Sequence, residues 1–109
     1  MSNLPVYTIL IDDDKMVHLF WEMEAKKQGS MLKTFFSVAE FLEVSDNINK
    51  KSNIFVDSNL ADNLKGEIES EKIAKEDFPN IYLATGYSAD DFEKPSWVKD
   101  IVGKRPLFF

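Results

Sequence analysis

Short apolar runs alternate with amphipathic stretches along the whole chain. Apolar runs of four to eight residues, rich in β-branched or aromatic side chains, are typical of strands buried on both faces of a sheet. Five runs predict such strands: residues 6–11, 32–36, 53–56, 81–84 and 100–103.

The stretches between these runs predict helices. Residues 15–28 carry apolar side chains at helical spacing, and Gly29 is expected to end this helix. The side chains at this spacing are Met16, Leu19, Phe20 and Met23. Ser37 and Glu40 form a capping box that predicts the start of the next helix. Its buried stripe should be Val38, Phe41 and Leu42. Weaker patterns predict helices over residues 68–75 and 89–92.

Strands that alternate with helices predict an α/β fold with a parallel sheet and helices on both of its faces. The chain has 109 residues, which suits one domain over residues 1–109. In such sheets functional groups gather beyond the carboxyl ends of the strands. Three acids, one hydroxyl and one amine follow strands in this way: Asp12, Asp13, Asp57, Thr85 and Lys104.

The acidic run at residues 12–14 follows the first strand directly. Like charges this close disfavour ionisation, and a divalent cation removes the penalty. Carboxylates with open water positions suit Mg²⁺ better than Zn²⁺. A solvated loop that begins a helix is an equally good interpretation of this run alone, since Asp is common at helix N-caps.

Asp57 favours the cation site over the solvated loop as the interpretation of the acidic run. A lone Asp at a strand end is more often a turn former, but beside an acidic pair it has a chemical use. A metal-bound carboxylate can attack phosphorus and form an aspartyl phosphate. Phosphoryl transfer then needs positioning and cover of the negative oxygens, which the Lys104 amine and the Thr85 hydroxyl can supply.

The order of these motifs resembles that of CheY-like receiver domains over nearly the whole chain. The matching segments, in order, are ILIDDD, IFVD, LATG and DIVGK. The resemblance implies a flavodoxin-like, doubly wound sheet of five parallel strands. It also implies a two-component signalling function, in which a histidine kinase or phosphotransfer protein donates a phosphoryl group and a downstream protein partner reads the change.

The resemblance also implies a role for each site residue. Asp57 is the expected phosphoacceptor and a Mg²⁺ ligand, and Asp13 is expected to bind Mg²⁺ directly, with Asp12 supporting it through water. The backbone carbonyl of Asn59 is the expected third protein ligand. Thr85 is expected to hydrogen-bond the phosphoryl group and Lys104 to pair with it. Asp14 has no expected essential role.

Several positions depart from the family pattern. The loop after Asp57 has Ala61 in place of the usual Pro, and its glycine, Gly66, comes one residue late. Arg105 separates Lys104 from Pro106, so Arg105 is an alternative to Lys104 at the site. The switch aromatic of the fifth strand is absent, and Tyr87 is a possible substitute.

The two last helices of the family pattern are also affected. The interval from Thr85 to Lys104 predicts a short fourth helix, and the fifth helix is missing or truncated. Leu107, Phe108 and Phe109 are expected either to cover the sheet in its place or to form a patch for a second copy or a partner.

The composition of the chain excludes several classes of function. The net charge of −6 disfavours direct nucleic-acid binding, and the absence of cysteine excludes thiolate chemistry. No apolar run approaches the ~20 residues of a membrane span, and no signal peptide is evident, so a cytoplasmic location is expected. His18, the only histidine, is expected on a helix surface.

Two other functions stay open at this stage. One is an interaction module that keeps the fold but no longer accepts phosphate, which the unusual loop and missing helix favour. The other is a small phosphatase of the haloacid dehalogenase type, with Asp12 and Asp14 as its Asp-x-Asp motif. The phosphatase lacks room for a late acidic pair and a substrate cap, so it ranks below the other two.

Overall fold

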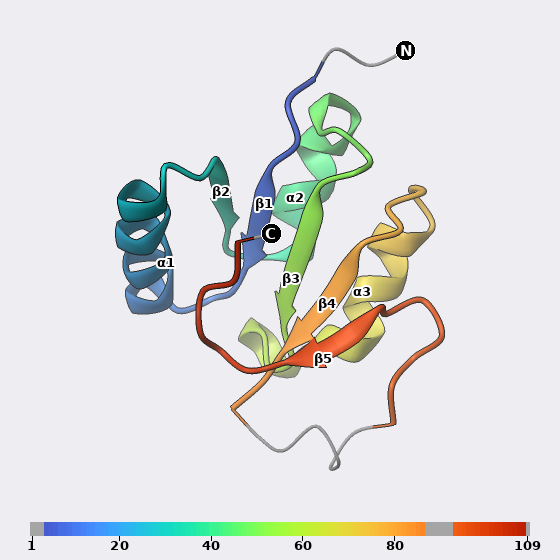
Figure 1. Ribbon diagram of the computed structural model, residues 1–109. Helices are drawn as coiled ribbons and strands as arrows, with labels where there is room; N and C mark the ends of the chain where they lie inside the picture. The colour runs from blue at the N-terminus through green and yellow to red at the C-terminus, as the bar shows by residue number, and fades with distance from the viewer. Residues whose placement is uncertain (1–3, 87–92, 109) are drawn as a thin grey trace.

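Five parallel strands form a single sheet in the order β2-β1-β3-β4-β5 (Figure 1). The structure is a computed structural model that describes residues 4–86 and 93–108. The strands are β1 (Thr8–Ile11), β2 (Leu32–Phe35), β3 (Asn53–Asp57), β4 (Ile81–Ala84) and β5 (Asp100–Val102). Each of the five predicted strands forms, and the predicted doubly wound α/β architecture is confirmed.

Helices cover both faces of this sheet. One face carries α1 (Lys15–Gln28), while the opposite face carries α2 (Val38–Val44) and α3 (Gly66–Ala74) (Figure 1). The predicted helix over residues 89–92 and Tyr87 lie outside the described residues. No helix in the described ranges is long and apolar enough to cross a membrane.

Local signals explain where two of the helices begin and end. Gly29 ends α1 with φ of 65°, a left-handed conformation that glycine adopts without a steric penalty. Ser37 caps α2 by accepting a hydrogen bond of 3.1 Å from the Glu40 amide. The Glu40 carboxylate accepts from the Phe36 amide at 3.2 Å. The Ser37 half of the predicted capping box is therefore present, whereas the return hydrogen bond reaches the residue before the N-cap.

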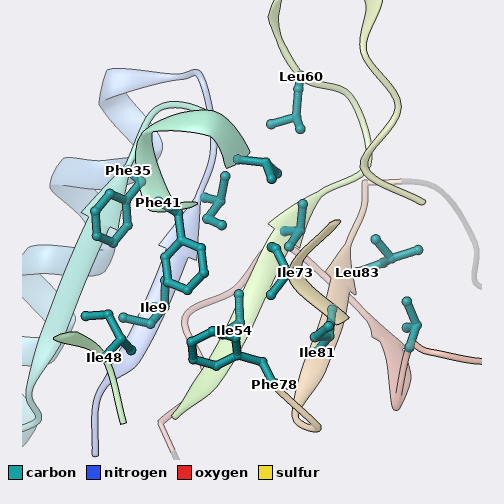
Figure 2. Close-up of a cluster of buried hydrophobic side chains, with 14 residues drawn as sticks. Ile9, Phe35, Phe41, Ile48, Ile54, Leu60, Ile73, Phe78, Ile81 and Leu83 are labelled. Carbon is teal, nitrogen blue, oxygen red and sulfur yellow. The ribbon is translucent and has the colours of Figure 1, made fainter. Parts of the chain in front are cut away.

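The larger apolar core lies between the sheet and the helices α2 and α3 (Figure 2). Ile9, Ile54 and Ile81, from three neighbouring strands, are all fully buried in it. Phe41 of α2 packs edge-on against Phe35 and Phe78, with ring centroids 5.4 and 5.3 Å away. Val38 and Phe41 are buried and Leu42 is half-buried, as the predicted stripe required.

A smaller aromatic cluster covers the other face of the sheet. Trp21 of α1 meets Phe55 of β3, and Phe55 stacks on Tyr82 of β4 with centroids 4.9 Å apart. Residues 103–108, the described part of the segment after β5, form no helix and run back towards β1 and α1, and Phe109 lies outside the described residues (Figure 1). Leu107 and Phe108 of this segment pack against the aromatic cluster. They therefore cover the sheet in place of a fifth helix, which is the first of the two predicted alternatives.

The orientation of α1 corrects the sequence interpretation. The helix has the predicted bounds, but Met16, Phe20 and Met23 of the predicted stripe are 70%, 51% and 62% exposed. The buried side chains of α1 are His18, Trp21 and Ala25. Trp21 decides this orientation, because its large side chain fills the space over Phe55. His18 is therefore buried, and its predicted surface position was wrong.

Candidate functional site

The carboxyl ends of the strands bring the predicted site residues to one edge of the sheet. Asp12 follows β1 directly, and Asp57 is the last residue of β3. Asp57 pairs in register with Ala84, so Thr85 lies one residue further along the neighbouring strand. The Thr85 amide donates to the Val102 carbonyl at 3.0 Å, which places Lys104 beyond the same edge.

Three carboxylates form the centre of this edge. Asp12, Asp13 and Asp57 each offer one oxygen, and these oxygens lie within 4.8 Å of one another. Asp12 and Asp57 are only 1% and 2% exposed, whereas Asp13 is exposed. Such a cluster of hard oxygen donors, open to solvent on the Asp13 side, fits a cation such as Mg²⁺ that keeps several waters.

Backbone contacts fix Asp12 in this cluster. Its amide donates to the Phe35 carbonyl at 3.0 Å, and its Oδ1 accepts from the Asp14 amide at 2.9 Å. Burial raises the pKa of Asp12 to about 6, and the negative charges of Asp57 and Asp13 act in the same direction. The Asp14 hydrogen bond and the Lys104 charge oppose this rise without cancelling it. A buried carboxylate with a raised pKa gains stability from a nearby cation.

Lys104 provides the positive charge of the site. Its Nζ lies 2.8 Å from Asp57 Oδ1 and 3.8 Å from Asp12 Oδ2. Burial acts to lower the pKa of Lys104, but the hydrogen bond and charge of Asp57 outweigh it, so the pKa is raised. Arg105 is exposed and lies beside Phe20 and Glu24 of α1, away from the carboxylates. Lys104, not Arg105, therefore contacts Asp57.

The loop after Asp57 presents the Asn59 backbone to the site. Asn59 lies opposite Lys65 in an isolated antiparallel bridge, and its amide donates to Asp57 Oδ1 at 3.3 Å. The two hydrogen bonds beside the bridge join residues 60 and 64 and residues 58 and 66, both at 3.0 Å. Asn59 and Lys65 are thus a non-hydrogen-bonded pair, in which the peptide groups point away from the partner strand. The Asn59 carbonyl is consequently available to a cation.

Gly66 allows α3 to begin directly beside Asp57. A Cβ at Gly66 would overlap the backbone carbonyl of Asp57 and touch the Cα of Ser58. The shifted glycine of the sequence thus has a steric function, because no side chain fits between α3 and β3. The loop before it contains Asp62 and Asn63 in left-handed conformations, with φ of 62° and 60°.

Several solved structures share this architecture, and two of the three described here are response regulators. The PhyR receiver domain from Erythrobacter litoralis matches with a TM-score of 0.62 and 20% identity, over 87% of this chain and 78% of that chain. The response regulator StyR matches with a TM-score of 0.70 and 16% identity, over 90% of this chain and 50% of that chain. An uncharacterized protein from Neptuniibacter caesariensis matches with a TM-score of 0.72 and 18% identity, over 94% and 78%.

This chain has the receiver fold. No protein-family model and no curated protein sequence matched it. At these identities the structural likeness establishes the fold, and the chain spans half the length of StyR.

Two residues at the start of α1 make further contacts next to the site. Asp14 caps α1, because its Oδ1 accepts from the Met16 amide at 2.9 Å. This contact gives Asp14 a structural use, in agreement with the interpretation of the acidic run as the start of a helix. His18 lies against the site, with Nε2 2.6 Å from the Asp12 carbonyl oxygen. Its signal in the sequence is its place four residues after the N-cap, one turn into α1 and near Asp12.

Proposed function

We propose that the chain is a phosphoacceptor receiver domain that takes one phosphoryl group onto Asp57 in a Mg²⁺-dependent reaction. The observation that carries the proposal is the environment of Asp57. Its carboxylate is buried among two further carboxylates and lies 2.8 Å from the Lys104 amine. The receiver fold of the whole chain supports the same function.

The donor set of the site suits Mg²⁺. Asp13 and Asp57 would hold the ion with the Asn59 carbonyl, and Asp12 would support it through water. When bound, Mg²⁺ would supply positive charge that offsets the clustered carboxylates and the phosphoryl oxygens. The raised pKa of Asp12 and the short distances between the carboxylates both favour a cation at this position.

Asp57 is the proposed nucleophile. One of its carboxylate oxygens forms a bond to phosphorus while the bond from phosphorus to the donor breaks. With a phosphohistidine donor, the broken bond is P–N, and the departing imidazole keeps the electron pair and takes up a proton from water. Burial holds the carboxylate in one orientation at the strand end, which is the positioning that phosphoryl transfer requires.

Lys104 and Thr85 are proposed to stabilise the phosphorylated form. Lys104 contacts Asp57 in the unmodified chain and would pair with the phosphoryl oxygens after transfer. Thr85 lies beside the end of β3 and would hydrogen-bond the same group. An added phosphoryl group brings about −1.5 to −2 charges in the known case of phosphorylated hydroxyl residues, enough to reorder nearby loops.

The proposed partners follow from this chemistry. A histidine kinase or a phosphotransfer protein would donate the phosphoryl group, and a downstream protein would bind the altered surface. A small phosphodonor can replace the kinase in a test, because the proposed chemistry resides in this chain.

Acetyl phosphate and Mg²⁺ provide that test. Intact mass spectrometry should detect one added phosphoryl group per chain, dependent on Mg²⁺ and absent from Asp57→Asn. Asp14→Asn is the matched control, because it changes an adjacent carboxylate that caps α1, and it should still accept phosphate. A folded chain that binds Mg²⁺ but gains no mass would instead indicate an interaction module that does not accept phosphate.

A further inference from the structure

His18 joins α1 to the acidic turn of the site. Its side chain is 3% exposed, and its Nε2 lies 2.6 Å from the backbone carbonyl oxygen of Asp12. The imidazole ring also stacks on Phe36, with ring centroids 4.2 Å apart and an interplanar angle of 17°. The ring is therefore held both by a hydrogen bond at its tip and by a contact across its face.

The chemistry of this contact fixes the state of the ring. A carbonyl oxygen only accepts hydrogen bonds, so the proton of the contact resides on Nε2 of His18. The distance of 2.6 Å is slightly shorter than the usual range for a hydrogen bond from nitrogen to oxygen, which begins at about 2.7 Å. Phe36 is itself anchored, because its amide donates to the Glu40 carboxylate at 3.2 Å. The stacking surface for His18 is thus set by the first turn of α2.

The Asp12 carbonyl belongs to the peptide group that joins Asp12 to Asp13. The amide of Asp12 is held by Phe35, and its side chain accepts from the Asp14 amide. These contacts hold the amide and the side chain of Asp12. They do not determine how the Asp12–Asp13 peptide plane is rotated. Among the residues that the structure describes, His18 makes the one hydrogen bond to that peptide plane.

We propose that His18 is a positioning residue, whose Nε2–H sets the orientation of the Asp12–Asp13 peptide and so directs the Asp13 carboxylate into the site. This inference rests on the proposed function for its link to Mg²⁺. Asp13 is exposed, so burial alone does not hold its side chain beside Asp12 and Asp57. Loss of the donor would also leave a buried carbonyl without a partner, which favours rotation of the peptide towards water.

Two substitutions separate the donor from the ring. His18→Phe keeps an aromatic ring against Phe36 but removes the hydrogen-bond donor. His18→Gln loses the stacking but offers an amide N–H near the former position of Nε2. If His18 only filled space, the Phe variant should resemble the original chain more closely than the Gln variant. The proposed role predicts the opposite, both for the orientation of the Asp13 N–H and for Mg²⁺ affinity.

The orientation of the peptide can be measured without any metal. Residual dipolar couplings of the Asp13 N–H in ¹⁵N-labelled, metal-free chain report the direction of that bond directly. We expect His18→Phe to change the Asp13 coupling while couplings in β3 and β4 stay the same, and His18→Gln to retain the original value. An unchanged Asp13 coupling in a folded His18→Phe chain would overturn the proposal.

The unaltered chain offers a check that does not depend on how the variants fold. The His18 Nε2–H should appear as a slowly exchanging proton with a scalar coupling to the Asp12 carbonyl carbon. A ring protonated on Nδ1 alone would contradict the proposal.

Calorimetric titration then tests the consequence for the cation. His18→Phe should weaken Mg²⁺ binding at least tenfold, and His18→Gln should restore it to within about threefold of the original chain. Equal Mg²⁺ affinity in the Phe variant and the original chain would overturn the positioning role. If the original chain binds no Mg²⁺, the proposed function fails, and the dipolar couplings still decide whether His18 sets the peptide orientation.

Discussion

The carboxyl edge of the sheet and the apolar layer directly beneath it follow opposite rules. In the layer, Ile9, Ile54 and Ile81 are fully buried and surrounded by carbon, so each contributes favourable burial without a polar requirement. At the edge, Asp12 and Asp57 are almost as deeply buried but carry charge beside charge. The layer stabilises the fold, and this stability offsets the cost of holding buried carboxylates close together at the edge.

The backbone is also regular in the apolar layer and unusual beyond the edge. The strands of the layer pair in regular parallel register. The loop beyond the edge places Asp62 and Asn63 in left-handed conformations, which are unusual for residues other than glycine. Strain and unfavourable charge thus occur together beyond the strand ends. The comparison predicts that truncating an apolar side chain in the layer lowers the free energy of unfolding. Removing a charge at the edge should raise the free energy of unfolding and weaken Mg²⁺ binding.

The largest effect on stability should come from the layer. Phe41→Ala removes a fully buried ring between Phe35 and Phe78, and should lower the free energy of unfolding by about 3–5 kcal/mol. Phe20→Ala is the matched control, because Phe20 also lies on a helix but is 51% exposed. Its effect should be within about 0.5 kcal/mol. Equal losses from both in urea unfolding would contradict the assigned core.

A substitution at the boundary of the two regions should come next. Gly66→Ala forces a Cβ into the Asp57 carbonyl, so it should lower the free energy of unfolding by about 3 kcal/mol and reduce Mg²⁺ affinity. Gly103→Ala is the control, since a Cβ there meets no atom within 4 Å. Thermal unfolding and calorimetric titration of both variants measure the difference. A Gly66→Ala chain as stable as the control would refute the close approach of α3 to β3.

Some features of these two regions could be predicted from the sequence, and others could not. Strand positions and their order are predictable, because parallel strands between helices leave few arrangements for apolar runs. The edge is predictable as a meeting place, since Asp12, Asp57 and Lys104 each lie at or just beyond the carboxyl end of a strand. The face of α1 is not predictable from spacing, because two apolar stripes compete and the fit of Trp21 over Phe55 selects one. The contact of His18 with Asp12 depends on that choice.

At the edge, removal of a charge should increase stability. Asp12→Asn keeps an oxygen that can accept from the Asp14 amide but removes a buried charge. The folded-state pKa of Asp12 is about 6 against an ordinary 3.8, so ionised Asp12 disfavours the fold at pH 8. Asp12→Asn should therefore raise the free energy of unfolding of the metal-free chain by about 3 kcal/mol, measured in urea.

The same variant should bind Mg²⁺ more weakly, which separates stability from function. Asp46→Asn, at an exposed position, is the control and should change neither property. A loss of stability in Asp12→Asn at pH 8 would show that the charge of Asp12 is favourable in the fold, against the proposed conflict at the edge.

The pH dependence of this conflict has a defined sign. Because the folded-state pKa of Asp12 is raised, the metal-free chain should lose stability as pH rises from about 4 to about 6 through this group, and level off above. Protonation of Asp12 removes a negative charge that would support the ion through water, so Mg²⁺ affinity should fall by up to about tenfold per pH unit below about 6. Calorimetric titrations between pH 5 and 8, interpreted with roughly one proton released per ion, measure this effect. A Mg²⁺ affinity that is constant over this range would contradict it.

The position of the phosphoryl group tests the central claim most directly. After reaction with acetyl phosphate and Mg²⁺, borohydride reduces an aspartyl phosphate to homoserine, and peptide mapping by mass spectrometry locates the altered residue. The account predicts homoserine in place of Asp57 and unmodified Asp12 and Asp13. Homoserine at Asp12 or Asp13, or at no position in a folded chain that binds Mg²⁺, would contradict the assignment of Asp57 as the phosphoacceptor.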